Sequence, residues 1–211
     1  MKAHEQKIIM KKIFKYIIIV VIILGFSFLY AHINKEVPIF DKTVDSATYG
    51  NMGEMTTGLC VQQKFLCSQN VLNGISIKCV TYGHQLTSVY NYQILDGKTG
   101  KILREGILNA KEVKNNQYFT IWFDQITDCK NRELLFTLES KDASFGNALT
   151  VYNIPKGNEQ AELRLNSDDF SENTLAIRTI STDFDWETFV GVSFYLLYLY
   201  IFIQVLFKFF S

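Results

Sequence analysis

Two long segments without a single charged residue constrain this chain of 211 residues more than any other feature. Residues 16–33 and 189–207 contain no Asp, Glu, Lys or Arg, and seven residues of the second segment are Phe or Tyr. A helix of about 20 residues spans the hydrocarbon core of a bilayer, which is roughly 30 Å thick. Because lipid offers no hydrogen bonds to a backbone, both segments are predicted to be transmembrane α-helices.

Each segment also has an alternative explanation. Residues 16–33 could be a cleaved signal peptide, but their apolar stretch exceeds the usual length of about 7–15 residues. The cleavage motif is also poor, since Leu29 stands two positions before Ala31. We therefore favour an uncleaved signal anchor. Residues 189–207 could be the buried core helix of a globular protein, but they lack a polar face, which favours a membrane span.

The charges are divided unevenly along the chain, although its formal net charge is zero. Residues 1–15 carry five lysines and one glutamate, whereas residues 34–188 carry fifteen basic and twenty acidic side chains. The positive-inside rule places the basic tail in the cytoplasm. A second span then returns residues 208–211 to the cytoplasm and leaves the central region on the outer side of the cell membrane. This mildly acidic region lacks the basic surface of a nucleic-acid-binding domain.

The central region has the pattern of a β-protein. Short runs rich in β-branched and aromatic residues recur between Gly, Asn and Asp residues, and the turn at residues 96–100 separates two of them as in a hairpin. We therefore predict an all-β domain over residues 59–188, a β-sandwich or jelly roll. The less regular residues 34–58 are predicted to form a stalk with one edge strand. The expected strands are residues 59–66, 75–82, 89–95, 101–108, 118–123, 134–139, 148–154, 161–165 and 175–180.

Several short motifs in this region also follow a recognisable order. They run from a Q-x-F strand start through an N-G-I strand, a T-Y pair and a D-x-x-x-G hairpin to a D-x-K turn and a strand ending in Ser. The residues that carry them are Gln63, Phe65, Asn73, Gly74, Ile75, Thr81, Tyr82, Asp96, Gly100, Phe123, Asp128, Lys130 and Ser140.

Residues 59–152 therefore resemble an extracytoplasmic β-sandwich module attached to bacterial membrane proteins of surface-polysaccharide and glycosyltransferase systems. The resemblance implies an accessory or glycan-binding module in cell-surface polysaccharide assembly. It also implies a partner in the membrane, such as a glycosyltransferase or a flippase. This chain departs from the pattern because it has no multi-pass catalytic domain.

The cysteines Cys60, Cys67, Cys79 and Cys129 all fall in the predicted extracytoplasmic region. An even number of cysteines permits disulfides there, and the pairs Cys60–Cys67 and Cys79–Cys129 are both open to formation. Buried free thiols are the alternative, because cysteine is a good small core residue. No C-x-x-C pair is present, so we expect neither a structural zinc site nor a thioredoxin-like redox pair. No residues are predicted to bind a metal, and no cofactor is expected.

Signals for catalysis are sparse. His84 is the one histidine in the central region, and we expect it to be an ordinary loop residue. Most carboxylates fall at turns, where Asp is favoured for its local hydrogen bonds. We therefore predict a protein that is not an enzyme. The alternatives are a small membrane-bound glycan-active enzyme that uses two facing carboxylates, or a structural or sensing subunit of a membrane complex.

Aromatic residues supply the remaining candidates. Tyr90 and Tyr92 share one face of a strand, and Tyr118 and Trp122 share a face of another, so either set could line a sugar-binding platform. Packing in the core is the alternative. In the second apolar segment, a tyrosine hydroxyl buried in lipid costs on the order of 1–3 kcal/mol. We therefore predict that Tyr195 and Tyr198 contact the first span or a partner helix.

Overall fold

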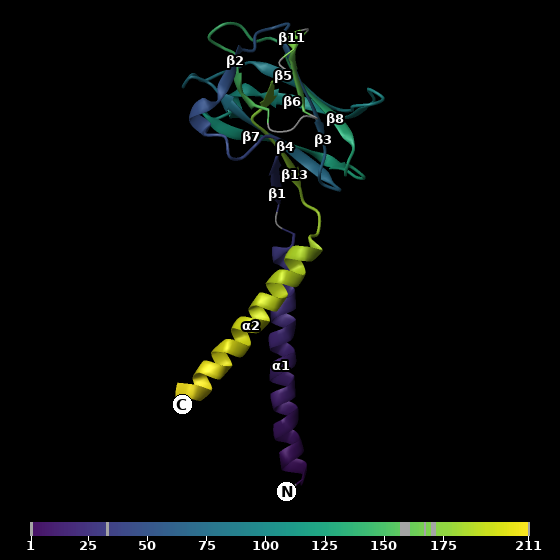
Figure 1. Ribbon diagram of the computed structural model, residues 1–211, viewed down its shortest axis with the longest axis vertical. Helices are drawn as coiled ribbons and strands as arrows, with labels where there is room; N and C mark the ends of the chain where they lie inside the picture. The colour runs from purple at the N-terminus through teal and green to yellow at the C-terminus, as the bar shows by residue number, and fades with distance from the viewer. Residues whose placement is uncertain (1, 33, 157–160, 167, 170–171, 211) are drawn as a thin grey trace. The chain divides into compact units, whose positions relative to one another are not determined.

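The computed structural model describes residues 2–32, 34–156, 161–166, 168–169 and 172–210. The chain divides into two compact units, a helical unit formed by residues 1–33 with 183–211, and a β-domain formed by residues 34–182 (Figure 1). The predicted all-β domain flanked by two apolar helices is therefore the observed fold.

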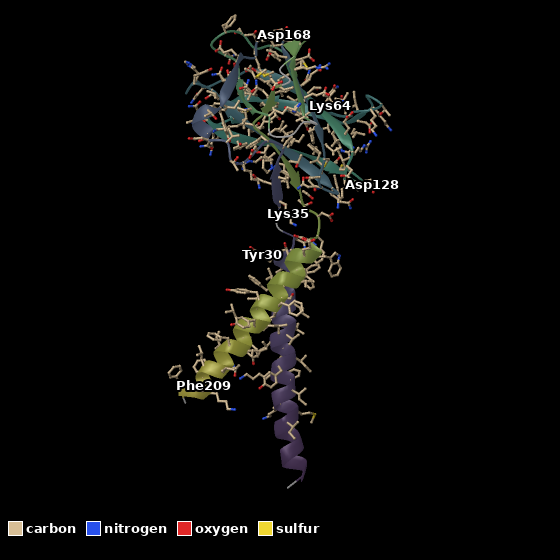
Figure 2. The ribbon with its side chains drawn as sticks, viewed as in Figure 1. Tyr30, Lys35, Lys64, Asp128, Asp168 and Phe209 are labelled. Carbon is tan, nitrogen blue, oxygen red and sulfur yellow. The ribbon has the colours of Figure 1, made fainter. Side chains whose placement is uncertain are left out.

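The helical unit contains α1 (Lys2–Tyr30) and α2 (Trp186–Phe210). Within them, Ile9–Tyr30 and Trp186–Phe210 are long and apolar enough to cross a membrane. The side chains drawn on both helices are almost all carbon, whereas those of the β-domain carry many oxygen and nitrogen atoms (Figure 2). The helix α1 extends well upstream of residue 16 because Lys, Gln and Glu are good helix formers. It ends at Tyr30, and the predicted end of the span at residue 33 lies outside the described residues.

The two helices are in contact with each other. Among the described side chains of this unit, the buried ones are Ile23, Ser27 and Ala31, spaced four residues apart, and Ser193 of α2, and three of these four are small. Small side chains at such an interface allow two backbones to approach closely. At the start of α2, the Asp185 carboxylate accepts a hydrogen bond from the backbone N–H of Glu187 at 3.1 Å, which caps the helix.

The β-domain is a sandwich of two antiparallel sheets. The seven-stranded sheet has the order β1-β13-β4-β9-β12, with β2 also paired to β9 and β7 also paired to β4, and the six-stranded sheet has the order β11-β10-β3-β8-β5-β6. The strands are β1 (Lys35–Pro38), β2 (Gly50–Glu54), β3 (Cys60–Leu66), β4 (Leu72–Val80), β5 (Val89–Asp96), β6 (Ile102–Asn109), β7 (Gln117–Ile126), β8 (Glu133–Ser140), β9 (Thr150–Pro155), β10 (Glu162–Leu165), β11 (Asp168–Asp169), β12 (Asn173–Leu175) and β13 (Ile177–Ser181). Short 3-10 helices cover Ser46–Thr48 and Ala110–Glu112.

Alternate residues of the longer strands fill the space between the sheets. Ile75 and Ile77 of β4 face Phe65 of β3 and Phe136 of β8 across a single core, and each of the four is at most 1% exposed. This alternation is why the nine runs of β-branched and aromatic residues each became a strand of the sandwich.

The predicted stalk at residues 34–58 is wrong. The strand β1 pairs with β13, which confirms the expected edge strand, but β2 pairs with β9 as well. Met55 is fully buried in the core. A register shift between Asn51 and Glu54, with Gly53 at a φ of 76°, interrupts the period-two pattern that would have identified β2. The domain also ends at Thr182 instead of residue 188, because α2 begins at Trp186.

Candidate functional site

Two of the four aromatic residues predicted to bind sugar lie in the core. Tyr90 is 0% exposed and Tyr92 is 7% exposed. The Tyr90 hydroxyl donates to the carbonyl oxygen of Met55 at 3.0 Å and accepts from the backbone N–H of Leu149 at 2.7 Å. Burial raises the pKa of both tyrosines. The prediction for this pair is wrong because an alternating strand has two faces, and the pattern does not say which one is solvated.

The other two, Tyr118 and Trp122, lie on the outer face of the seven-stranded sheet. Both belong to β7, in which Phe119, Ile121 and Phe123 pack against the core from the opposite face. Trp122 is 54% exposed, and Tyr118 is half-buried. The structure thus brings this predicted pair to one outward surface.

Trp122 rests on a gap left by a glycine of the neighbouring strand. Gly74 of β4 is the direct cross-strand partner of Trp122. A Cβ atom at Gly74 would lie 3.2 Å from Cε3 of the Trp122 ring and 3.0 Å from the carbonyl oxygen of Ile121. The same Cβ atom would lie 3.6 Å from the Cβ atom of Ile180, which is buried. The missing side chain therefore lets the indole pack against the sheet while more than half of its surface stays exposed.

A stacked cation lies beside this platform. The guanidinium carbon of Arg178, on β13, is 3.8 Å from the centroid of the Tyr118 ring. Its Nη1 atom lies 2.8 Å from Oε2 of Glu36 on β1. Burial opposes the charged form of Arg178, but the hydrogen bond to Glu36 and the adjacent tyrosine together raise the pKa of the guanidinium. The stacked arginine is therefore a fixed positive charge at the surface.

A second cation lies between two tyrosine rings. Nζ of Lys78 is 5.0 Å from the centroid of Tyr49 and 4.9 Å from that of Tyr152, and the two rings meet edge to face at 6.3 Å. Among the described residues, no carboxylate lies within ion-pair distance of this ammonium group. Lys78 therefore presents a positive charge that is held in place by aromatic rings instead of by a counter-ion.

We define the aromatic–basic face as the outward surface formed by these six side chains, Tyr49, Lys78, Tyr118, Trp122, Tyr152 and Arg178. It adjoins a surface hollow of about 370 Å³. The hollow is lined by Glu36, Pro38, Phe40, Lys42, Tyr49 and Arg178. A ring-shaped polar ligand therefore has both a flat apolar surface and fixed cations within one face of the sheet.

The sequence analysis missed four members of this face. Tyr49 was assigned to the stalk, and Arg178 and Tyr152 lie on strands that β4 joins only in the folded sheet. One signal was available for Lys78, because it alternates with Ile77 and Cys79, which are inward. A lysine on the outward side of a strand is ordinary, however, and only its tyrosine neighbours make this one distinctive.

A second hollow, of about 390 Å³, lies on the outer face of the six-stranded sheet across β6, β5 and β8. It is polar, and Nε2 of Gln93 donates to Oε2 of Glu105 at 3.2 Å. Its lining includes two carboxylates, Glu105 and Glu139. Lys64, labelled in Figure 2, lies further along the same face and is paired with Glu133 at 3.1 Å.

No disulfide joins any of the four cysteines in the structure. Neither of the two pairings that the sequence left open is present. Cys79 is fully buried, and burial raises its pKa to about 12. Cys67 instead contacts Cys129, as described below. His84 lies in the loop between β4 and β5, as expected, and among the described residues no cluster of His, Cys, Asp or Glu is arranged to hold a metal ion.

Tyr195 and Tyr198 lie on an exposed side of α2. They are 62% and 63% exposed, and Tyr198 stacks on Phe202 of its own helix with ring centroids 6.1 Å apart. The residue of α2 that is buried is Ser193, whereas both tyrosines are exposed, so of the two predicted neighbours, the first span and a partner helix, the exposure favours the partner helix. Contact with a partner helix stays a prediction.

No protein-family model and no curated protein matches this chain. One solved structure to which it is similar is that of the cysteine protease and lectin-like domains of Cwp84, a surface layer associated protein of Clostridium difficile. The identity is 12% and the TM-score is 0.42, over 65% of this chain. The match spans 36% of the Cwp84 chain.

Proposed function

We propose that this protein is a membrane-tethered glycan-binding module that works on the outer side of a bacterial cell membrane. The observation that carries the proposal is Trp122, whose indole packs over Gly74 and leaves its outward surface free. The C–H faces of sugar rings pack well on such flat aromatic surfaces, and an exposed tryptophan on a rigid strand needs no rearrangement to accept one.

The neighbouring charges suggest that the glycan is acidic. Lys78 and Arg178 stand on the same face of the sheet, and the ammonium of Lys78 has no carboxylate partner among the described residues. A carboxylate or phosphate group on the glycan would supply the missing counter-ion through a charge-assisted hydrogen bond. The aromatic–basic face is thus suited to a sugar chain with negatively charged substituents.

The two apolar helices support the location. With five lysines before the first of them, the positive-inside rule favours cytoplasmic termini and an external β-domain. We infer that binding serves polysaccharide assembly beside a membrane enzyme such as a glycosyltransferase or a flippase, and that the β-domain itself is not catalytic. Tethering at both ends would keep the module within reach of a membrane-bound glycan and raise its effective concentration.

The two tryptophans of the chain allow a sharp test. The full chain in detergent, carrying Trp186→Phe, reports on Trp122 alone by fluorescence. Titration with purified acidic and neutral surface polysaccharides is expected to quench that emission, more strongly for the acidic ones. In the otherwise natural chain, Trp122→Ala is expected to weaken binding about tenfold or more, while Trp186→Ala leaves it unchanged. Equal binding by both alanine variants would refute the proposed face.

The alternative is a glycan-active enzyme, and the hollow that contains Glu105 and Glu139 is the observation in its favour. Incubating the full chain with the same polysaccharides and measuring the chain length of the products tests it. Shortened products that disappear in Glu105→Gln or Glu139→Gln would support the enzyme. Unchanged polysaccharide, together with binding that requires Trp122, would support the binding module.

A further inference from the structure

Cys67 and Cys129 are brought together from distant parts of the sequence. Cys67 follows β3, and Cys129 lies in the turn between β7 and β8. Both are 0% exposed. Each thiol has the largest effect on the pKa of the other, through a hydrogen bond between them. Neither is adjacent to the remaining two cysteines in that way.

The backbone fixes this pair on both sides. The N–H of Cys67 donates to the carbonyl of Arg132 at 2.9 Å, and the N–H of Asn131 donates to the carbonyl of Cys67 at 2.8 Å. The N–H of Cys129 donates to the carbonyl of Asn70 at 2.9 Å. Cys67 is thus bonded to the two residues that follow the turn at Cys129, so the two buried side chains enter the core from adjacent segments.

We propose that Cys67 and Cys129 are oxidised to a disulfide that closes the turn between β7 and β8 onto the end of β3. The oxidant is a protein disulfide of an extracytoplasmic thiol oxidase. The thiolate of Cys67 attacks one sulfur of that disulfide and forms a mixed disulfide, while its proton passes to water. The sulfur of Cys129 then loses its proton and attacks Sγ of Cys67, which releases the oxidase as a dithiol. Two electrons pass to the oxidase.

The two cysteines are suited to these separate roles. The hydrogen bond from the Cys129 thiol holds the pKa of Cys67 below that of an ordinary thiol, although burial opposes this effect. The same contact, with burial, raises the pKa of Cys129. Once their two segments are in contact, Cys67 is therefore the first nucleophile and Cys129 the resolving thiol. Because both are buried in the finished domain, the exchange takes place after these two segments meet and before the rest of the sandwich covers them.

The test counts thiols in the full chain. Membranes are dissolved directly in a denaturant that contains N-ethylmaleimide and no reductant, so that buried free thiols also react, and the chain is then purified and analysed by mass spectrometry. We expect two modified cysteines, Cys60 and Cys79, and a peptide that links residues 67 and 129 and is lost on reduction. Cys67→Ser is expected to give three modified cysteines, and Cys60→Ser one.

Four modified cysteines in the natural chain would overturn the proposal, as would a link between any other pair. The mass measurement does not depend on whether a variant folds. As an independent measurement, reduction of the purified chain is expected to lower its melting temperature by on the order of 10 °C, because the bridge encloses a long loop. The Cys129→Ser chain serves as the control, since its melting temperature should not respond to reductant.

Discussion

Gln63 is a single buried side chain that ties the two sheets together, and replacing it tests the structure severely. It is 0% exposed on β3 of the six-stranded sheet. Its Nε2 donates to the carbonyls of Lys64 at 2.9 Å and Glu162 at 3.1 Å. Its Oε1 accepts from the N–H of Leu175 at 2.7 Å and the hydroxyl of Thr174 at 3.1 Å, both in the seven-stranded sheet.

The substitution Gln63→Leu keeps most of the volume and removes all four hydrogen bonds. Leu175 and Thr174 are 1% and 0% exposed, so their two donors lose an acceptor with no water to replace it. Each such unpaired donor costs about 1–3 kcal/mol, and the added apolar burial recovers only part of this. We expect a loss of about 3 kcal/mol, which for a domain of about 150 residues is a fall in melting temperature of roughly 6–12 °C.

The assay is thermal unfolding of the full chain in detergent, followed by circular dichroism near 218 nm as the usual β-sheet signal. The matched control is Gln62→Leu, one residue away on the same strand, because Gln62 points to the partly solvated outer face. The control is expected to shift the melting temperature by less than about 2 °C. A similar small shift for Gln63→Leu would refute the network, and equal large shifts would show that position 63 is not special.

Three further predictions concern the turn, the platform and the second helix. The hydrogen bonds from Thr99 and the ion pair with Arg132 lower the pKa of Asp96. This carboxylate therefore stabilises the fold above its unfolded pKa of about 3.9, and the benefit is lost as the pH falls through the folded pKa. The gap in melting temperature between natural and Asp96→Asn chains should therefore be full at pH 7 and should narrow in acid, and a constant gap would contradict this. Gly74→Ala should push the indole outward and weaken glycan binding about tenfold, as measured by fluorescence titration. Its new methyl group also comes within 3.0 Å of the carbonyl oxygen of Ile121, so the melting temperature should fall as well. Replacing Tyr195 and Tyr198 by Leu should leave membrane insertion intact and reduce cross-linking of α2 to a partner helix, whereas capture of lipid alone by probes at both sites would remove the basis for that partner.

The sequence was sufficient to predict both apolar helices and most of the strands, although not β2, β11 and β12, because the predicted elements depend on a local pattern. Period-two alternation marks Ile75 and Ile77 as one face of a strand wherever that strand lies in the sheet. The same pattern could not distinguish Tyr90 from Trp122, since both alternate with polar residues. Which face of a strand is buried depends on the sheet that packs against it. The contact of Cys67 with Cys129 could not be predicted for a similar reason, because it depends on which strands and turns become neighbours.

The pairing of β1 with β13 has a consequence for the order in which the β-domain forms. Lys35 is aligned with Ser181, so the first strand of the domain completes its ladder only with the last one. The strand β4, which lies on the other side of β13 in the sheet, likewise lacks a neighbour on one side until β13 has formed. During synthesis, an open strand edge is therefore exposed until almost the whole domain has emerged. Contacts between such distant residues slow folding and favour misassembly, so a chain interrupted before residue 177 should be unable to close the seven-stranded sheet and should be prone to aggregation.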